Sequence, residues 1–173
     1  MNTQQDEIQN PIFSKSSISF VKIALEFCTL VENVFTSEKQ VFIDSALNIL
    51  PLLYLHARML PSIAEDYNTV LEIGVQEENY EAINAQIGSL LGEDNMYLET
   101  FHTDIQFSDL PVAVPISESL ADIYQDIGNF IFNFQQGEKE IMSDSLQACS
   151  SNFKEYWGQS LVNVLRALHS LKN

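Results

Sequence analysis

Three side chains near the middle of the chain have the types and spacing of metal ligands. Glu99 and His102 form a Glu-x-x-His pair, and Asp104 follows two residues later. Carboxylate and imidazole groups are common ligands of zinc and iron. A ferritin-like di-iron centre needs two such pairs and two further Glu residues, whereas this chain contains one pair. The alternatives are a single metal site at these three residues or a surface histidine flanked by ordinary acids.

A second group of polar residues follows a proline. Pro51 lies inside an apolar helical pattern, where its ring removes one backbone donor and clashes with the preceding turn, so we expect a kinked helix. A kink frees backbone carbonyls and can shape a pocket together with the segment 93–115. The residues expected to line it are Tyr54, His56, Arg58 and Arg166.

Arg166 stands among apolar residues, so it must either reach solvent or meet a carboxylate. Asp122 and Asp126 lie one helical turn apart and would be natural partners. Counting outward from the turn at Gly137, however, the heights of Asp122 and Arg166 differ by roughly 20 Å. We therefore expect Arg166 to form an ion pair with an acid on another helix. The alternative is that Arg166 belongs to a binding site. The acids available are Glu26, Glu32 and Glu118.

Five stretches of the chain have apolar residues at the intervals of three and four that are typical of an α-helix. They are residues 16–35, 37–60, 77–91, 117–134 and 138–171. The short turn at Gln136-Gly137 makes the last two antiparallel. The sequence predicts an all-α, antiparallel bundle of about five helices with a long C-terminal helical hairpin.

Polar residues at the ends of these stretches predict the helix boundaries. Gly92 suits the residue after the third helix. Residues 93–115 contain two prolines and are expected to form an irregular, extended crossover, while residues 1–13 are expected to fray. Serine side chains can cap three helices: Ser14, Ser16 or Ser17 for the first, Ser37 with Gln40 as a capping box for the second, and Ser117 or Ser119 for the fourth.

Composition narrows the function classes. The 173 residues suit a single domain, and they include 8 basic and 24 acidic side chains, for a net charge of −16. Nucleic acids and anionic membranes are bound by clustered Lys and Arg, but the basic residues here are scattered. We therefore expect neither nucleic acid nor a membrane as a direct partner.

The expected compartment is the cytoplasm. The N-terminal MNTQQDEIQN has neither the basic nor the apolar region of a signal peptide. The longest strongly apolar uncharged run, Ala46–Leu55, has ten residues, against roughly 20 needed to span a bilayer. Cys28 and Cys149 lie in helical apolar patterns without CxxC spacing, so we expect buried free thiols.

The strings LPLLYLHARMLP, ISESLADIYQDIGNFIFNFQQG and YWGQSLVNVLRALH carry a likeness to a known family. The chain resembles, over nearly its whole length, the bacterial family catalogued as domain of unknown function five-zero-six-three. The resemblance implies a small helical cytoplasmic protein from anaerobic gut-type bacteria. It implies no activity and no catalytic residue.

The expected function is non-enzymatic and consists of binding another protein through an apolar or acidic helical face. The chain holds 11 Phe, 6 Tyr and 1 Trp, and it contains no nucleophile elbow, phosphate loop or dinucleotide fingerprint. No cofactor is expected. The alternative is a metal- or small-ligand-binding protein whose site lies near the Pro51 kink and the 93–115 crossover.

Overall fold

The structure is a computed structural model that describes residues 10–63, 66–99 and 112–171. Helices dominate these ranges, with a single pair of short strands. The α-helices are α2 (Lys15–Glu32), α3 (Lys39–Arg58), α4 (Glu77–Leu91), α5 (Ile116–Phe134), α6 (Lys139–Asn152) and α7 (Gly158–Ser170). The strands are β1 (Met96–Glu99) and β2 (Val112–Pro115), and the short helical turns are η1 (Pro11–Phe13), η2 (Val34–Thr36), η3 (Gly92–Asn95) and the π-helical η5 (Phe153–Trp157).

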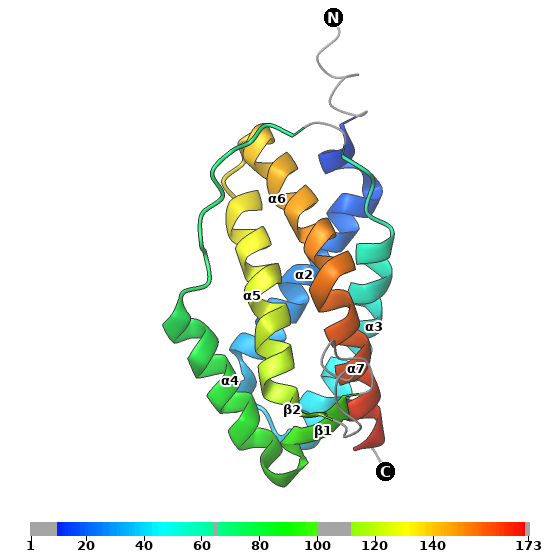
Figure 1. Ribbon diagram of the computed structural model, residues 1–173, viewed down its shortest axis with the longest axis vertical. Helices are drawn as coiled ribbons and strands as arrows, with labels where there is room; N and C mark the ends of the chain where they lie inside the picture. The colour runs from blue at the N-terminus through cyan, green and yellow to red at the C-terminus, as the bar shows by residue number, and fades with distance from the viewer. Residues whose placement is uncertain (1–9, 64–65, 100–111, 172–173) are drawn as a thin grey trace, which may run out of the picture.

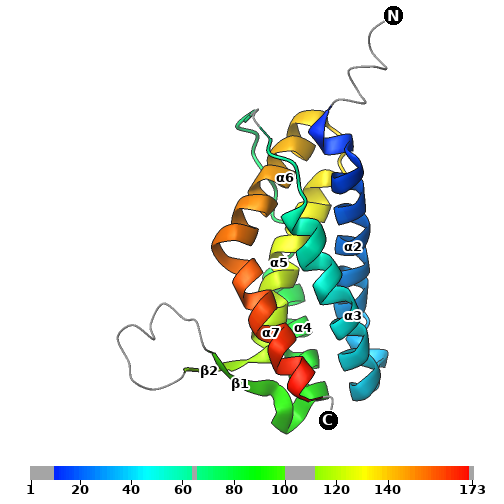
Figure 2. The ribbon, with the colours of Figure 1, turned by 90° about the vertical axis from the view of Figure 1, so that its right-hand side faces the viewer.

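The body of the molecule is an antiparallel bundle (Figures 1 and 2). Contacts join α2 to α3, α2 to α5, α5 to α6 and α3 to α7, while α4 packs on the outside of α5. Buried side chains from all of these helices form one hydrophobic core. Because α6, η5 and α7 follow one another without a break, the described ranges contain five helices, and the fold predicted from the sequence is confirmed.

The long C-terminal helix contains one π turn. Residues Phe153–Trp157 form this turn, and the Gly158 N–H donates to the Phe153 carbonyl. A Cβ at Gly158 would lie 2.4 Å from that carbonyl oxygen. The Phe153 and Trp157 rings meet edge to face at 4.6 Å, and Trp157 Nε1 donates to the Cys149 carbonyl. Glycine at this position therefore lets the chain close the wider turn around two buried aromatic rings.

We expect Gly158→Ala to destabilise the protein. In an ordinary helix interior this change stabilises by about 1 kcal/mol, but here the added methyl overlaps backbone, and such overpacking costs about 1–3 kcal/mol. Urea unfolding measures the difference. Gly88→Ala in α4 is the control, because its Cβ would meet the end of the Asn95 side chain at 3.3 Å. A Gly158→Ala protein as stable as the original would contradict this account of the turn.

Two of the predicted caps are wrong. Glu38, not Ser37, precedes α3, and it makes no side-chain capping bond. α5 begins at Ile116, so Ser117 and Ser119 lie inside the helix rather than before it. The reason at α5 is a partner from outside the helix: Asn95 accepts from the Ser117 N–H at 2.9 Å and donates to its hydroxyl at 3.0 Å.

Residues 10–13 do not fray as predicted, because Pro11–Phe13 form η1, Asn10 caps it and Ile12 is buried. The other helix boundaries lie close to those predicted. Ser14 caps α2, and α4 spans the expected residues up to Gly92, whose φ is 60°. The helix through Pro51 continues to Arg58. The 93–115 crossover contains an antiparallel ladder that pairs Met96 with Pro115 and Glu99 with Val112.

Next to this ladder, a partly exposed ion pair joins the start of α3 to the turn after α4. Lys39 Nζ donates to the carbonyl of Leu91 at 2.7 Å and also pairs with Asp94. The start of α3 is thereby fixed to the end of α4. No helix in the described ranges combines the length and apolar character needed to cross a membrane.

Candidate functional site

The predicted metal ligands are only partly described. Glu99 lies at the end of β1 and accepts a hydrogen bond from Asn163 Nδ2 at 2.9 Å. His102 and Asp104 fall outside the described residues. Within residues 10–63, 66–99 and 112–171, no three His, Cys, Asp or Glu side chains converge as a metal site would require. The site at Glu99, His102 and Asp104 stays a prediction.

The predicted pocket residues lie at two different heights along the bundle axis. Tyr54 is on the second half of α3 and meets the Phe153 ring edge-on at 5.3 Å. His56 and Arg58 follow on the same helix, and His56 Nδ1 is buried without a hydrogen-bond partner among the described residues. Arg166 lies 13 positions beyond Phe153, roughly 20 Å along the rod, so it is not grouped with the other three.

Arg166 and the acids expected to pair with it make other contacts. Arg166 Nη2 donates to the Leu98 carbonyl on β1 at 3.3 Å. Glu32 instead accepts from the Tyr124 hydroxyl at 2.9 Å, and Asp122 accepts from the Tyr80 hydroxyl at 2.7 Å. Arg166 is exposed, so its guanidinium reaches solvent as well as the β1–β2 ladder, which the sequence did not predict and which ends beside α7.

The outward side of α3 carries a row of exposed apolar side chains, with the exposed polar residues Gln40, Asn48 and Arg58 in and beside it. Figure 2 looks onto this side, where α3 runs between α2 and α7. Five of the exposed positions of α3, namely 41, 48, 52, 55 and 59, fall within about 60° of the helix circumference, and Asn48 is the polar residue among these five. We call the other four the α3 stripe, with exposed fractions of 56%, 43%, 51% and 51%: Val41, Leu52, Leu55 and Met59.

A second feature is the extended segment of residues 66–76, which we call the strap. It leads from the end of α3 across the bundle and along α5 to the start of α4 (Figure 1). Its first part is held by Asp144 of α6, which accepts from the Tyr67 N–H at 3.0 Å, the Thr69 N–H at 2.7 Å and the Thr69 hydroxyl at 2.8 Å. Between them, Asn68 has a φ of 54°, a left-handed conformation that Asn tolerates. This bend aims both N–H groups at one carboxylate.

Two asparagines of α5 hold the rest of the strap. Asn133 accepts from the Glu72 N–H at 2.9 Å and donates to the Glu72 carbonyl at 2.8 Å. Asn129 Oδ1 accepts from the N–H groups of both Gly74 and Val75, each at 2.9 Å. These amides act for the strap as the neighbouring strand of a sheet would, because they satisfy its backbone donors and one acceptor.

Glycines bring the strap and α5 into close contact. A Cβ at Gly74 would lie 2.3 Å from Phe132 Cβ, and one at Gly128 would lie 2.4 Å from Val75 Cγ2. Both positions therefore need the absence of a side chain. The buried Val75 then sits against Gly128 on α5, so packing adds to the hydrogen bonds.

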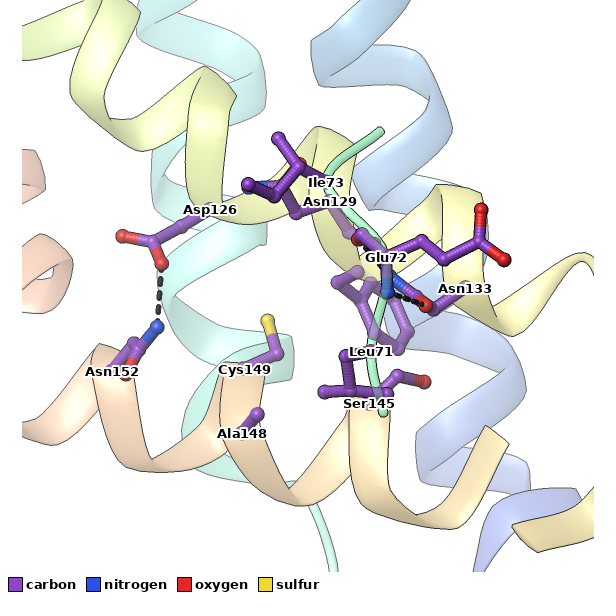
Figure 3. Close-up of a pocket in the computed structure, with 11 residues that line it drawn as sticks. Leu71, Glu72, Ile73, Asp126, Asn129, Asn133, Ser145, Ala148, Cys149 and Asn152 are labelled. Atoms are coloured by element: carbon purple, nitrogen blue, oxygen red, sulfur yellow. Dashed lines mark hydrogen bonds between the residues drawn. The ribbon is translucent and has the colours of Figure 1, made fainter. Parts of the chain in front are cut away.

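A pocket of about 220 Å³ lies between the strap, α5 and α6. Figure 3 shows Asp126 and Asn152 at one end, with Asn152 Nδ2 donating to Asp126 Oδ1 at 2.6 Å. Cys149 points into the middle, and Leu71 and Ser145 lie toward the other end. The remaining lining residues are Glu72, Ile73, Ala148, Asn129, Phe130 and Asn133. This pocket, which we call the strap pocket, was not predicted from the sequence.

Two titratable side chains of the strap pocket, Asp126 and Cys149, have raised pKa values. Burial raises the pKa of Asp126; the bond from Asn152 works against this, and the nearby charge of Asp122 adds to it. Burial also raises the pKa of the Cys149 thiol well above its ordinary value. Because the thiolate is the nucleophilic form, Cys149 is an inert part of the wall. Both Cys149 and Cys28 are buried free thiols, as predicted.

A second, more open pocket of about 280 Å³ lies between η2, α4 and α5. Glu32 and Tyr124 form its polar wall and are bonded to each other.

The strap should be sensitive to acid through Asp144. Burial works to raise the pKa of Asp144, but the hydrogen bonds from Thr69 and Tyr67 outweigh it and lower that pKa below the ordinary 3.8. A carboxyl group with a lowered folded-state pKa contributes stability at pH values above its unfolded-state pKa. That contribution is lost as the pH falls through the folded-state pKa.

We therefore expect Asp144→Asn to lower the free energy of unfolding at pH 7 by about 1–3 kcal/mol, because charged hydrogen bonds are lost. The gap should close as the pH falls well below 3.8. Urea unfolding at pH 7 and pH 2.5 measures it. Asp66→Asn is the control, since within the described part of the chain exposed Asp66 accepts a local bond from the Asn68 N–H. A gap that persists unchanged at low pH would contradict the role of the charge.

Comparison with known proteins now places the chain. The model of the family described as "Domain of unknown function (DUF5063)" matches residues 11–173. The chain belongs to this family. The resemblance seen in the sequence is thus confirmed.

A solved structure is similar to this chain over nearly its whole length. The crystal structure of protein BF1032 from Bacteroides fragilis, a structural genomics target, is 44% identical to this chain with a TM-score of 0.84. The match covers 95% of this chain and 96% of that one. A search of curated proteins finds no match.

Proposed function

We propose that the protein acts without catalysis, by binding another protein through the α3 stripe. The observation that carries this proposal is the row of half-exposed apolar side chains at positions 41, 52, 55 and 59 on one side of a helix. A surface helix in a finished domain normally turns polar residues outward. Contiguous exposed apolar surface is typical of sites where proteins associate.

The charge of the chain favours a basic partner. At a net charge of −16, a second copy of the chain is repelled, whereas a cationic protein is attracted from a distance. The stripe is a straight row on a helix, with spacings of three and four at its C-terminal half. A second amphipathic helix matches this shape by packing its own apolar row alongside. The proposed partner is accordingly another protein that presents a basic amphipathic helix.

We expect the double substitution Leu52→Ser/Leu55→Ser to abolish partner capture, because it removes the centre of the stripe. The measurement is a pull-down with immobilised full-length protein from an extract of cells that naturally express it. The matched control is Ile18→Ser/Leu25→Ser on α2, where the exposed fractions are similar at 44% and 38%. The captured protein should be basic and should be released by salt, since attraction between exposed charges is screened.

Three results would overturn the proposal. One is that all three forms of the protein retain the same proteins. Another is that none retains any. The third is that the original protein elutes as a dimer that the Leu52→Ser/Leu55→Ser change dissociates, because the stripe would then be an interface between copies of this chain.

A further inference from the structure

The strap pocket has a carboxylate at one end and apolar side chains among the rest of its lining. Asp126 and Asn152 form the polar end, while Leu71, Ile73 and Phe130 contribute hydrocarbon surface elsewhere in the lining. Glu72 also lines the pocket, but Figure 3 shows its carboxylate turned away from Asp126. A pocket with one inward carboxylate and apolar surface beside it suits a small molecule with one polar head and a short apolar body. The volume of about 220 Å³ limits that body to a few carbon atoms.

The charge at the polar end is not neutralised within the described part of the chain. The contact of Asp126 is with an amide, Asn152 Nδ2, and the ion pair formed in the described ranges joins Lys39 to Asp94. The nearest charged neighbour along α5 is another acid, Asp122, one helical turn away. A half-buried carboxylate without a cation is costly, so a ligand that carries a positive charge would gain from binding there.

The other polar groups of the lining have little left to offer a ligand. Both atoms of the Asn133 amide are bonded to Glu72, and Asn129 Oδ1 already accepts two backbone N–H groups. The Ser145 hydroxyl donates to the Met142 carbonyl. Their bonds serve the strap and the helix, which leaves Asp126 as the group that selects the ligand.

The lining distinguishes an organic cation from a metal ion. Calcium takes six to eight oxygen ligands and magnesium six, and a single carboxylate with one amide is far from such a set. An ammonium group instead brings its own hydrogen-bond donors, which a carboxylate accepts. Its alkyl chain would lie against the apolar lining and displace water from it.

We propose that the strap pocket binds a small primary alkylammonium ion, with its charged head on the Asp126 carboxylate and its alkyl chain between the strap and α6. This inference is independent of the protein partner proposed for the α3 stripe. The two sites are formed by different elements, and their tests use different variants.

The experiment is a titration of the ¹⁵N-labelled full-length protein with n-butylammonium chloride, followed by amide chemical shifts. n-Butanol is the neutral probe of equal size, and sodium chloride controls for ionic strength. We expect n-butylammonium to shift the amides of residues 71–73 and 148–152 in a saturable way, and n-butanol to bind roughly tenfold more weakly or worse, because it lacks the charge.

Two substitutions on α5 distinguish binding in the pocket from a general attraction of cations to the negatively charged protein. Asp126→Asn keeps the shape and removes the charge, so we expect roughly tenfold weaker binding or more. Asp122→Asn removes an equal charge one turn away, where the carboxylate binds the Tyr80 hydroxyl, so the affinity should stay within about twofold. Ala148→Leu should block binding by filling the pocket while Asp126 remains.

Four outcomes would overturn the proposal: no saturable shift up to tens of millimolar n-butylammonium, equal binding of n-butanol, an unchanged affinity in Asp126→Asn, or equal losses in Asp126→Asn and Asp122→Asn. If Ala148→Leu does not fold, the comparison of the two aspartate variants is sufficient to test the proposal. Dispersed amide spectra of those variants show that they are folded.

Discussion

The rest of the structure depends on which groups form hydrogen bonds with the backbone N–H and C=O groups of the strap. The chain must travel from the end of α3 to the start of α4, and the strap does so in an extended form, without the internal hydrogen bonds of a helix. A backbone donor that leaves water needs another acceptor. Asp144, Asn133 and Asn129 provide acceptors at three successive points. The position of the strap, and therefore of α4, is set by side chains of α5 and α6.

The same bonds create the strap pocket. They hold the strap beside α5 and α6 at a distance fixed by the length of an Asn or Asp side chain, while Gly74 and Gly128 allow closer packing next to them. Space remains where the lining residues are small, at Ala148, Ser145 and Cys149. The pocket is thus a consequence of fastening a loop with polar side chains in place of a continuous apolar contact.

Periodicity predicted the helices well because it reports which residues are buried. α4 and α5 follow from their apolar spacing, and the short turn at Gly137 makes the hairpin of α5 and α6 antiparallel. The caps were predicted less well, because a serine beside a helix does not reveal that Asn95, more than 20 residues earlier, bonds the first turn of α5 instead. The strap fastening was missed for the same reason. Asp122, Asp126, Asn129 and Asn133 recur at steps of four, three and four on one side of α5. This polar row was a usable signal, since a polar residue that becomes buried must find a partner.

The π turn allows the long C-terminal helix to lose one residue without a change in the side chains that it buries. Three successive steps of four residues separate Cys149, Phe153, Trp157 and Leu161, whereas three turns of an ideal α-helix contain about 11 residues. The turn absorbs the surplus residue, so both halves of the rod keep their apolar sides toward the core. A deletion of one residue inside 153–157 can therefore be accommodated by a return to α-helical geometry. The same deletion elsewhere in α6 or α7 would rotate everything beyond it by about 100°. The rod has one place where its length can change without altering which side chains it buries.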